Sequence, residues 1–182
     1  LSAFKADAEL MKEMKLLDVP DGSIALHFAD GHLQAVFGPG TYAYWNAAVE
    51  HTFQTVSLSS PRISPPLDPS ILSDAGLKDY VQRFQIDAYQ KGLLFFDGTF
   101  QGVITPGAHY FWKGPVQVAV TLVDMRQLQI DMTGQEILTV DRVSVRINFV
   151  CQYRITDPEK AVLQIKSYEE QLYIALQLIL RE

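Results

Sequence analysis

The sequence predicts an α+β protein built from two repeated antiparallel β units and ending in a helix. Three observations predict this fold. The chain repeats itself at an offset of 67 residues, each copy carries an Asp-Gly hairpin signal, and the apolar period changes from two to about 3.5 after Thr156. With 182 residues, of which 48% are hydrophobic, the chain is long enough to bury one or two cores.

The internal repeat is clearest between residues 30–45 and 97–112, where seven of sixteen positions are identical. Asp30-Gly31 falls on Asp97-Gly98 between two apolar runs, a pattern typical of a hairpin because glycine tolerates the positive φ of a tight turn. A Pro-Gly corner and an aromatic patch follow in both copies: Tyr42, Tyr44 and Trp45, then Tyr110, Phe111 and Trp112. The aromatic rings either form a ligand platform or cover one hydrophobic face of each hairpin, and the second interpretation is favoured.

The chain is expected to fall into three segments. Residues 1–58 hold the first β repeat and a short N-terminal helix, predicted from Leu10, Met11, Met14 and Leu17. Residues 59–79 form a Pro-rich linker and a short helix, because four prolines within nine residues exclude a central strand or a helix interior. A long surface loop within one domain is the alternative. Residues 80–182 form the second β unit and the start of a C-terminal helix.

Residues 143–153 alternate between apolar and polar side chains, which predicts a strand with one buried face. Cys151 falls on that face, where we expect it to act as a small hydrophobic residue. The spacing of Thr156 and Glu159 is that of a capping box, and Pro158 suits a first helical turn. Apolar residues downstream recur with the period of a coiled coil and are the candidate oligomerisation residues: Ala161, Ile165, Tyr168, Leu172, Ala175 and Ile179. A helix docked on its own sheet explains the same spacing.

No constellation of catalytic residues emerges from the sequence, which therefore indicates a non-enzyme without cofactor or metal. The single cysteine excludes an intrachain disulfide and a cysteine-based zinc site. The four histidines stand alone in the sequence and are expected to have structural or surface roles: His27, His32, His51 and His109. The net charge of −6 argues against a nucleic-acid partner.

The second β unit resembles an SPFH domain, the fold of the stomatin, prohibitin and flotillin superfamily, and within it the slipin, or stomatin-like, branch. Three stretches carry the resemblance, in the order expected of the family. They are residues 92–98 with the Pro106-Gly107-x-x-Tyr110-x-Trp112 pattern, residues 123–141 from Val123-Asp124-Met125-Arg126 to Asp141, and residues 153–161. The resemblance extends over residues 83–182. It implies an SPFH-type sheet with a packed helix that leads into a truncated coiled-coil helix.

The resemblance also implies a membrane-associated scaffold that forms homo-oligomers, organises membrane microdomains and regulates a partner. Its partners would be other copies of itself, membrane lipids and a membrane protein such as a serine protease. The chain opens without Met and ends within a helical pattern, so we expect a longer parent protein. The membrane anchor would then precede Leu1, with residues 1–182 themselves soluble, because no apolar run here is long enough to span a bilayer. A free-standing ligand- or peptide-binding β module and a component of a membrane protease are the alternatives.

Overall fold

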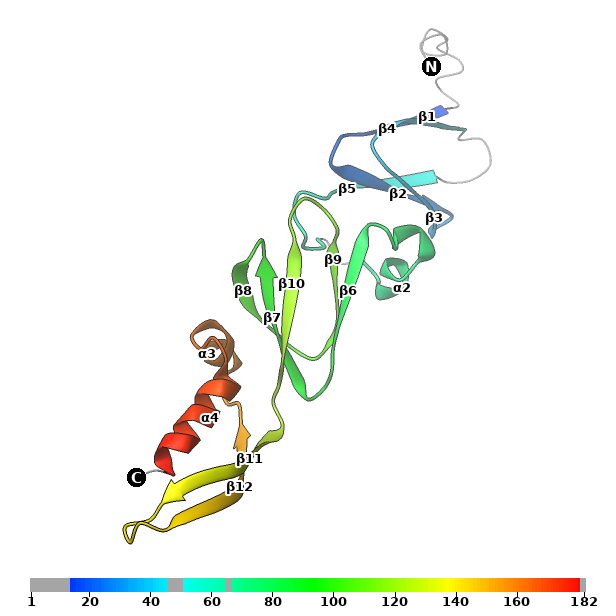
Figure 1. Ribbon diagram of the computed structural model, residues 1–182. Helices are drawn as coiled ribbons and strands as arrows, with labels where there is room; N and C mark the ends of the chain where they lie inside the picture. Colours follow the sequence, from blue (N-terminus) through cyan, green and yellow to red (C-terminus); the bar gives the residue numbers. More distant parts are fainter. Residues whose placement is uncertain (1–13, 46–50, 65–66, 181–182) are drawn as a thin grey trace. The chain divides into compact units, whose positions relative to one another are not determined.

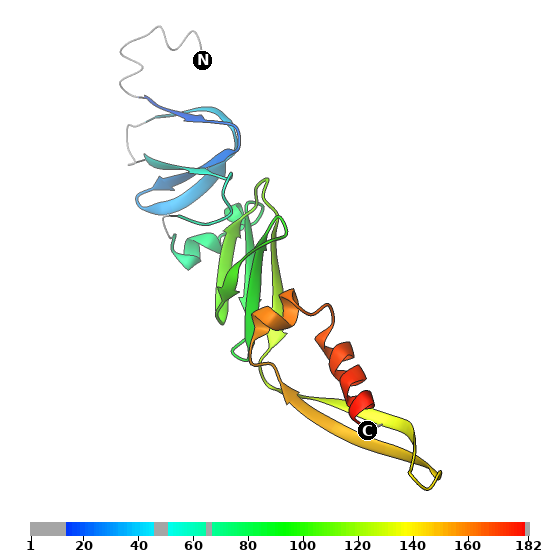
Figure 2. The ribbon, with the colours of Figure 1, turned by 90° about the vertical axis from the view of Figure 1, so that its left-hand side faces the viewer.

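The computed structural model describes residues 14–45, 51–64 and 67–180. It consists mainly of antiparallel β-sheets with a few helices, which confirms the predicted α+β class. The chain forms two compact units (Figures 1 and 2). The first unit contains residues 1–84 and 109–118, and the second contains residues 85–108 and 119–182.

Two sets of five strands have bounds that differ by the same offset of 67 residues. The first set is β1 (Met14–Val19), β2 (Ser23–Ala29), β3 (His32–Phe37), β4 (Gly40–Trp45) and β5 (His51–Ser57). The second set is β6 (Val81–Ile86), β7 (Gln90–Phe96), β8 (Thr99–Ile104), β9 (Gly107–Trp112) and β10 (Val118–Asp124).

Strand pairing is also the same in the two sets. Strands β1 and β4 form a two-stranded sheet, as do β6 and β9, while the three-stranded sheets have the orders β3-β2-β5 and β8-β7-β10. Ala25 pairs with Phe37 and Gly92 with Ile104, and both hairpins have a register shift at the same point of the strand. Both residues of each Asp-Gly pair have positive φ, so the predicted tight hairpins are confirmed.

The core of the first unit lies on one face of the β3-β2-β5 sheet. Ile24, Leu26 and Val56 are buried there together with residues from two short helices, α2 (Pro69–Leu72) and η2 (Ala75–Leu77), and from β6 and β9. Further apolar residues of the Pro-rich segment pack on this core: Ile63, Leu67 and Ile71. The described residues of this segment, 59–64 and 67–79, therefore contribute to the first unit and do not form a free linker.

The core of the second unit repeats this arrangement around Leu93 of β7 and Val123 of β10. Ile155 and Ala161 cover these residues, and Ala161 belongs to α3 (Pro158–Leu163). The short helices α2 and α3 start alike. Asp68 and Asp157 are the N-cap residues, each followed by a proline in the first turn. The capping box predicted from Thr156 was wrong by one residue, because Asp157 Oδ1 accepts the Lys160 N–H at 3.0 Å.

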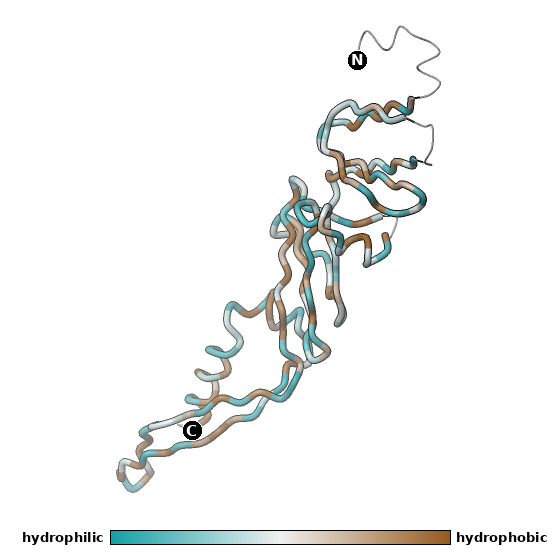
Figure 3. Tube along the Cα trace, turned by 90° about the vertical axis from the view of Figure 1, so that its right-hand side faces the viewer, coloured by the Kyte–Doolittle hydropathy of each residue, from teal (hydrophilic) through white to brown (hydrophobic). Residues whose placement is uncertain are grey.

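A long ribbon of two strands, β11 (Gln127–Leu138) and β12 (Ser144–Arg154), extends from the second unit. Hydrophobic and hydrophilic residues alternate along it (Figure 3). The predicted alternation is confirmed from Ile147 to Tyr153, with Cys151 half-buried, whereas Val143 and Val145 are exposed. A bulge interrupts β11 at Gly134, whose φ of 67° is one that glycine adopts without strain.

Two helix predictions need correction. The continuous C-terminal helix is divided by Gln164–Ser167 into α3 and α4 (Tyr168–Ile179). Ser167 followed by Glu169 and Glu170 is a helix start of its own, because acidic residues in a first turn interact favourably with the helix dipole. The predicted N-terminal helix is not formed at Met14 and Leu17, which lie in β1, while Leu10 and Met11 lie outside the described residues.

Close packing at Gly92 yields a first prediction. A Cβ built on Gly92 would lie 2.7 Å from Ile86 Cδ1 and 2.9 Å from Val120 Cγ1, whereas the equivalent residue of β2 is the buried Ala25. We expect Gly92→Ala to lower the free energy of unfolding of the second unit by about 1–3 kcal/mol through overpacking. Urea unfolding followed by far-UV circular dichroism measures the change.

The control for this prediction uses the positions of the two tryptophans. Trp45 and Trp112 both belong to the first unit, so the transition followed by tryptophan fluorescence should not move in Gly92→Ala. An unchanged circular dichroism transition would show that the sheet accommodates the methyl group.

Candidate interaction surfaces

Two histidines that are distant in the sequence form a pair inside the first unit. His27 of β2 is only 5% exposed, and its Nε2 lies 2.9 Å from Nδ1 of His51 of β5, so that one ring donates a hydrogen bond to the other. The His27 ring stacks on Phe53, with ring centres 4.8 Å apart and planes 15° apart. The two histidines stand apart in the sequence, and the fold brings them together in a packed, structural role.

Aromatic side chains surround the histidine pair. Tyr44 of β4 lies with its ring centre 4.8 Å from that of His27, and Phe37 of β3 lies 6.0 Å away. From β1, Lys15 Nζ donates a hydrogen bond of 2.7 Å to the backbone carbonyl of His51. We call these residues, with Phe53 and Tyr42, the histidine–aromatic cluster. Its tyrosines face other rings of the fold, which favours a covering role over a ligand platform, whereas Trp45 is exposed.

The described strands of the second set, β6 to β10, carry no such cluster. At the offset of 67 residues, Leu94 and Val118 stand where His27 and His51 are, and both are buried. Burial lowers the pKa of His27, and the neighbouring His51 lowers it further, because both effects disfavour the charged imidazolium. The repeat itself was the signal that could have revealed the pair, because it places both histidines at inward-facing positions.

Helix α4 lies alongside the β11–β12 ribbon and is joined to it by side-chain hydrogen bonds (Figure 1). Gln135 Nε2 donates to the Tyr173 hydroxyl at 3.2 Å, and Gln177 Nε2 donates to Gln135 Oε1 at 3.0 Å. Tyr153 donates to Glu169 Oε1 at 3.4 Å. Burial raises the pKa of Tyr153 to about 12, with a further contribution from the Glu169 carboxylate.

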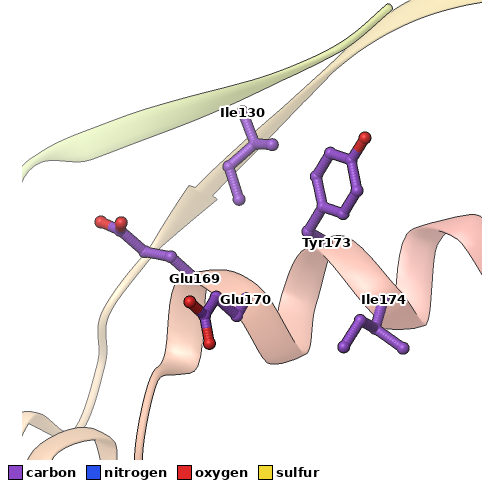
Figure 4. Close-up of a pocket in the computed structure, with 5 residues that line it drawn as sticks. All are labelled: Ile130, Glu169, Glu170, Tyr173 and Ile174. Carbon is purple, nitrogen blue, oxygen red and sulfur yellow. The ribbon is translucent and has the colours of Figure 1, made fainter.

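An open hollow of about 420 Å³ lies between the first half of α4 and the ribbon (Figure 4). Ile130 of β11 points towards the helix, where Tyr173 and Ile174 form the apolar part of the hollow. Glu169 and Glu170 form its acidic part. We call this site the α4 hollow.

The structure separates the six residues predicted for oligomerisation. Ala161 lies in α3 and is buried in the core of the second unit, where Tyr168 also packs. Ile165 lies between the two helices, and Leu172 is half-buried. Ala175 and Ile179 are exposed on α4.

Sequence reasoning missed two further residues of the exposed face of α4. Ile174 and Leu178 are 52% and 58% exposed, and they lie one turn apart. A heptad pattern selects one apolar stripe, so apolar residues that lie beside this stripe, as Ile174 lies beside Ala175 and Leu178 beside Ile179, give no separate signal.

Among the described residues, no three His, Cys, Asp or Glu side chains are grouped closely enough to hold a metal ion. None of the helices in the described part of the chain combines the length and the apolar character that crossing a bilayer requires.

Comparison with known proteins gives a family match and several archaeal relatives. The model of the SPFH domain / Band 7 family matches residues 84–182. A stomatin homologue of Pyrococcus horikoshii is 36% identical over 83 residues, which are 46% of this chain and 30% of that protein. An uncharacterised protein of Archaeoglobus fulgidus is 34% identical over 84 residues, 46% of this chain and 33% of that protein.

A further relative, an uncharacterised protein of Methanocaldococcus jannaschii, is 34% identical over 99 residues, 53% of this chain and 47% of that protein. The matched part of the chain thus spans between about a third and a half of the length of these relatives. No solved structure matches the chain.

The histidine pair makes the stability of the first unit depend on pH. The pKa of His27 is lower in the folded chain than its usual value of about 6.5, so below that pH the unfolded chain binds more protons. Stability should therefore be fully present above about pH 6.5 and fall as the pH drops towards the folded pKa. Urea unfolding followed by tryptophan fluorescence between pH 8 and pH 5 measures this (both values chosen to bracket the usual histidine pKa).

The matched variants for this prediction are His27→Leu and His51→Val, which introduce the residues of the second β set. The other titrating groups remain in both variants. The difference in the pH dependence of stability between each variant and the unmodified chain therefore reports on the histidine pair. Identical pH profiles in the unmodified chain and in both variants would contradict the assignment.

Proposed function

This chain belongs to the SPFH domain / Band 7 family, and from that premise we propose that it is part of a membrane-associated scaffold that assembles with copies of itself. The family match covers residues 84–182, and one of the relatives described above is named a stomatin homologue. These matches support a stomatin-like, or slipin, role, in which the scaffold organises membrane microdomains and regulates a neighbouring membrane protein, such as a protease. We propose no catalytic step, in keeping with a family whose members are generally scaffolds.

The exposed apolar face of α4 is the observation that carries the proposal of self-association. Ile174, Leu178 and Ile179 are each more than half exposed, and no residue of α4 is fully buried. A helix that is apolar on both sides normally has a partner on each of them. The ribbon covers only one side, which leaves the other for a second helix.

The residues proposed for helix association therefore differ from the set that the heptad pattern selected. Ala175 and Ile179 remain, and Ile174 and Leu178 join them because they lie on the same exposed side. Ala161 and Tyr168 belong to the packed core, and we assign them to folding. The coiled coil that we propose begins at α4.

We further propose that the two strand sets arose as copies of one β unit. Their identical offset, pairing and register support a duplication. The copies have diverged at the histidine pair, which suggests separate roles. In this proposal the second unit carries the assembly surfaces of the scaffold.

Substitution of Leu178 tests the assembly function. A charged residue on the exposed face of α4 should lose the apolar burial of a leucine, worth about 1.5–3 kcal/mol. We expect Leu178→Lys to weaken self-association at least about tenfold in Kd. Sedimentation equilibrium over a range of protein concentrations measures it, with circular dichroism to establish that the variant is folded.

Leu122→Lys is the matched control, since Leu122 is also an exposed leucine of the second unit but belongs to β10. It should associate like the unmodified chain. If all three proteins associate equally, the exposed face of α4 takes no part in assembly. If the unmodified chain stays monomeric at every concentration, self-association of this segment is refuted.

A further inference from the structure

The tip of the β11–β12 ribbon is a turn fixed by several hydrogen bonds. The Thr139 N–H donates to the Val143 carbonyl at 3.0 Å, and the Val143 N–H donates to Thr139 Oγ1 at 3.1 Å. The Arg142 N–H donates to the Thr139 carbonyl at 2.9 Å. Arg142 has a φ of 64°, which is uncommon for a residue other than glycine. The turn therefore presents its side chains in a defined arrangement.

Aliphatic side chains dominate the surface of this tip. Val140 is fully exposed, and Leu138 and Val143 are 69% and 56% exposed. Turns usually carry Gly, Asn, Asp, Ser or Pro, so three neighbouring aliphatic residues are unusual at such a place. Neighbouring apolar side chains that the fold itself leaves uncovered are typical of an interaction site.

The α4 hollow in the same unit has the complementary character. Its apolar part is formed by Ile130, Tyr173 and Ile174, and the Tyr173 hydroxyl is held by Gln135. Its acidic part is formed by Glu169 and Glu170. The hollow can thus receive aliphatic side chains that are accompanied by a cation, and Arg142 is the one cation of the five-residue turn 139–143.

The tip and the hollow of one chain cannot meet. Ile130, which lines the hollow, and Leu138, at the start of the tip, are eight residues apart on the same strand. A β-strand rises about 3.3 Å per residue, which separates them by about 26 Å along the ribbon. A tip can therefore enter only the hollow of another molecule.

We propose that the ribbon tip of one copy, with Val140 at its centre, inserts into the α4 hollow of a second copy, where Arg142 meets Glu169 and Glu170. The second copy is favoured over a lipid surface because Asp141 and Arg142 together leave the tip without net charge, so that an anionic bilayer would not attract it. The hollow, by contrast, combines an apolar part that can receive Val140 with carboxylates that can pair with Arg142. The contact is head-to-tail, and repetition of such a contact generates a ring or a filament.

This inference rests on the proposed self-association and specifies a second contact, which shares Ile174 with the exposed face of α4. Disulfide trapping tests it directly, with Cys151→Ser as the background so that no other thiol is present. Chains carrying Val140→Cys are mixed with chains carrying Glu170→Cys and oxidised. We expect a covalent heterodimer on non-reducing gels.

Val150→Cys is the control for trapping, because Val150 is an exposed valine of β12 away from the tip. Mixed with the Glu170→Cys chain, it should yield no heterodimer above the level of random collision. Equal yields from Val140→Cys and Val150→Cys would overturn the inference.

Charge reversal provides a second test that does not depend on a disulfide. Sedimentation velocity should show self-association weakened several-fold by Arg142→Glu and about tenfold by Val140→Asp. Combining Arg142→Glu with Glu170→Arg should restore part of the loss, since the two charges again have opposite signs. Failure of this rescue together with failure of trapping would overturn the proposed contact.

The same variants separate this contact from the proposed function and from membrane binding. If Leu178→Lys abolishes association while Val140→Asp leaves it unchanged, the scaffold proposal stands and the tip contact is refuted. If neither variant changes association, both are refuted. A third outcome would assign the tip to a lipid surface instead. In that case the unmodified chain cosediments with phosphatidylglycerol vesicles, and Val140→Asp abolishes this binding without changing self-association.

Discussion

Each three-stranded sheet of this protein has an apolar face that its own strands cannot bury. The rest of the structure depends on how other segments of the chain cover that face. In the first unit Leu26 and Val56 are covered by the Pro-rich segment with α2 and η2, and by β6 and β9. In the second unit Leu93 and Val123 are covered by Ile155 and α3. A sheet with one bare apolar face would not be stable alone, so these covering segments are integral to the fold.

The same constraint explains why the outward-facing apolar residues gather on α4 and the ribbon. While α3 covers the sheet, α4 packs on the core of the second unit through Tyr168 and lies along the β11–β12 ribbon over the rest of its length. The ribbon shields one side of α4, and hydrogen bonds from Gln135 and Tyr153 fix that side in place. Much of the remaining apolar surface of the second unit lies on the other side of the helix and at the ribbon tip, where Leu178 and Val140 are more than half exposed. Both positions suit contacts between molecules, because neither is needed to complete a core.

The sequence predicted the features that depend on local rules. The Asp-Gly hairpins and the alternation from Ile147 to Tyr153 follow from turn chemistry and strand period, which act over a few residues. The histidine pair was not predictable in this way, since it requires knowing that β2 pairs with β5. The heptad spacing also gave no indication that the helix is interrupted after Leu163. Ala161 and Tyr168 are seven residues apart in the sequence whether or not they lie in one helix. Which side of α4 is exposed depends on tertiary packing alone.

The proposed scaffold combines contacts of two kinds. The proposed association of α4 with another α4 would join copies through the same surface on each, and such a self-complementary contact would be satisfied by a pair. A tip that enters a hollow uses two different surfaces, so an open assembly keeps one free tip at one end and one free hollow at the other until a ring closes. Ile174 borders the hollow and also lies on the exposed side of α4, so the two proposed contacts would adjoin on one helix. Their combination would convert pairs of helices into an extended array.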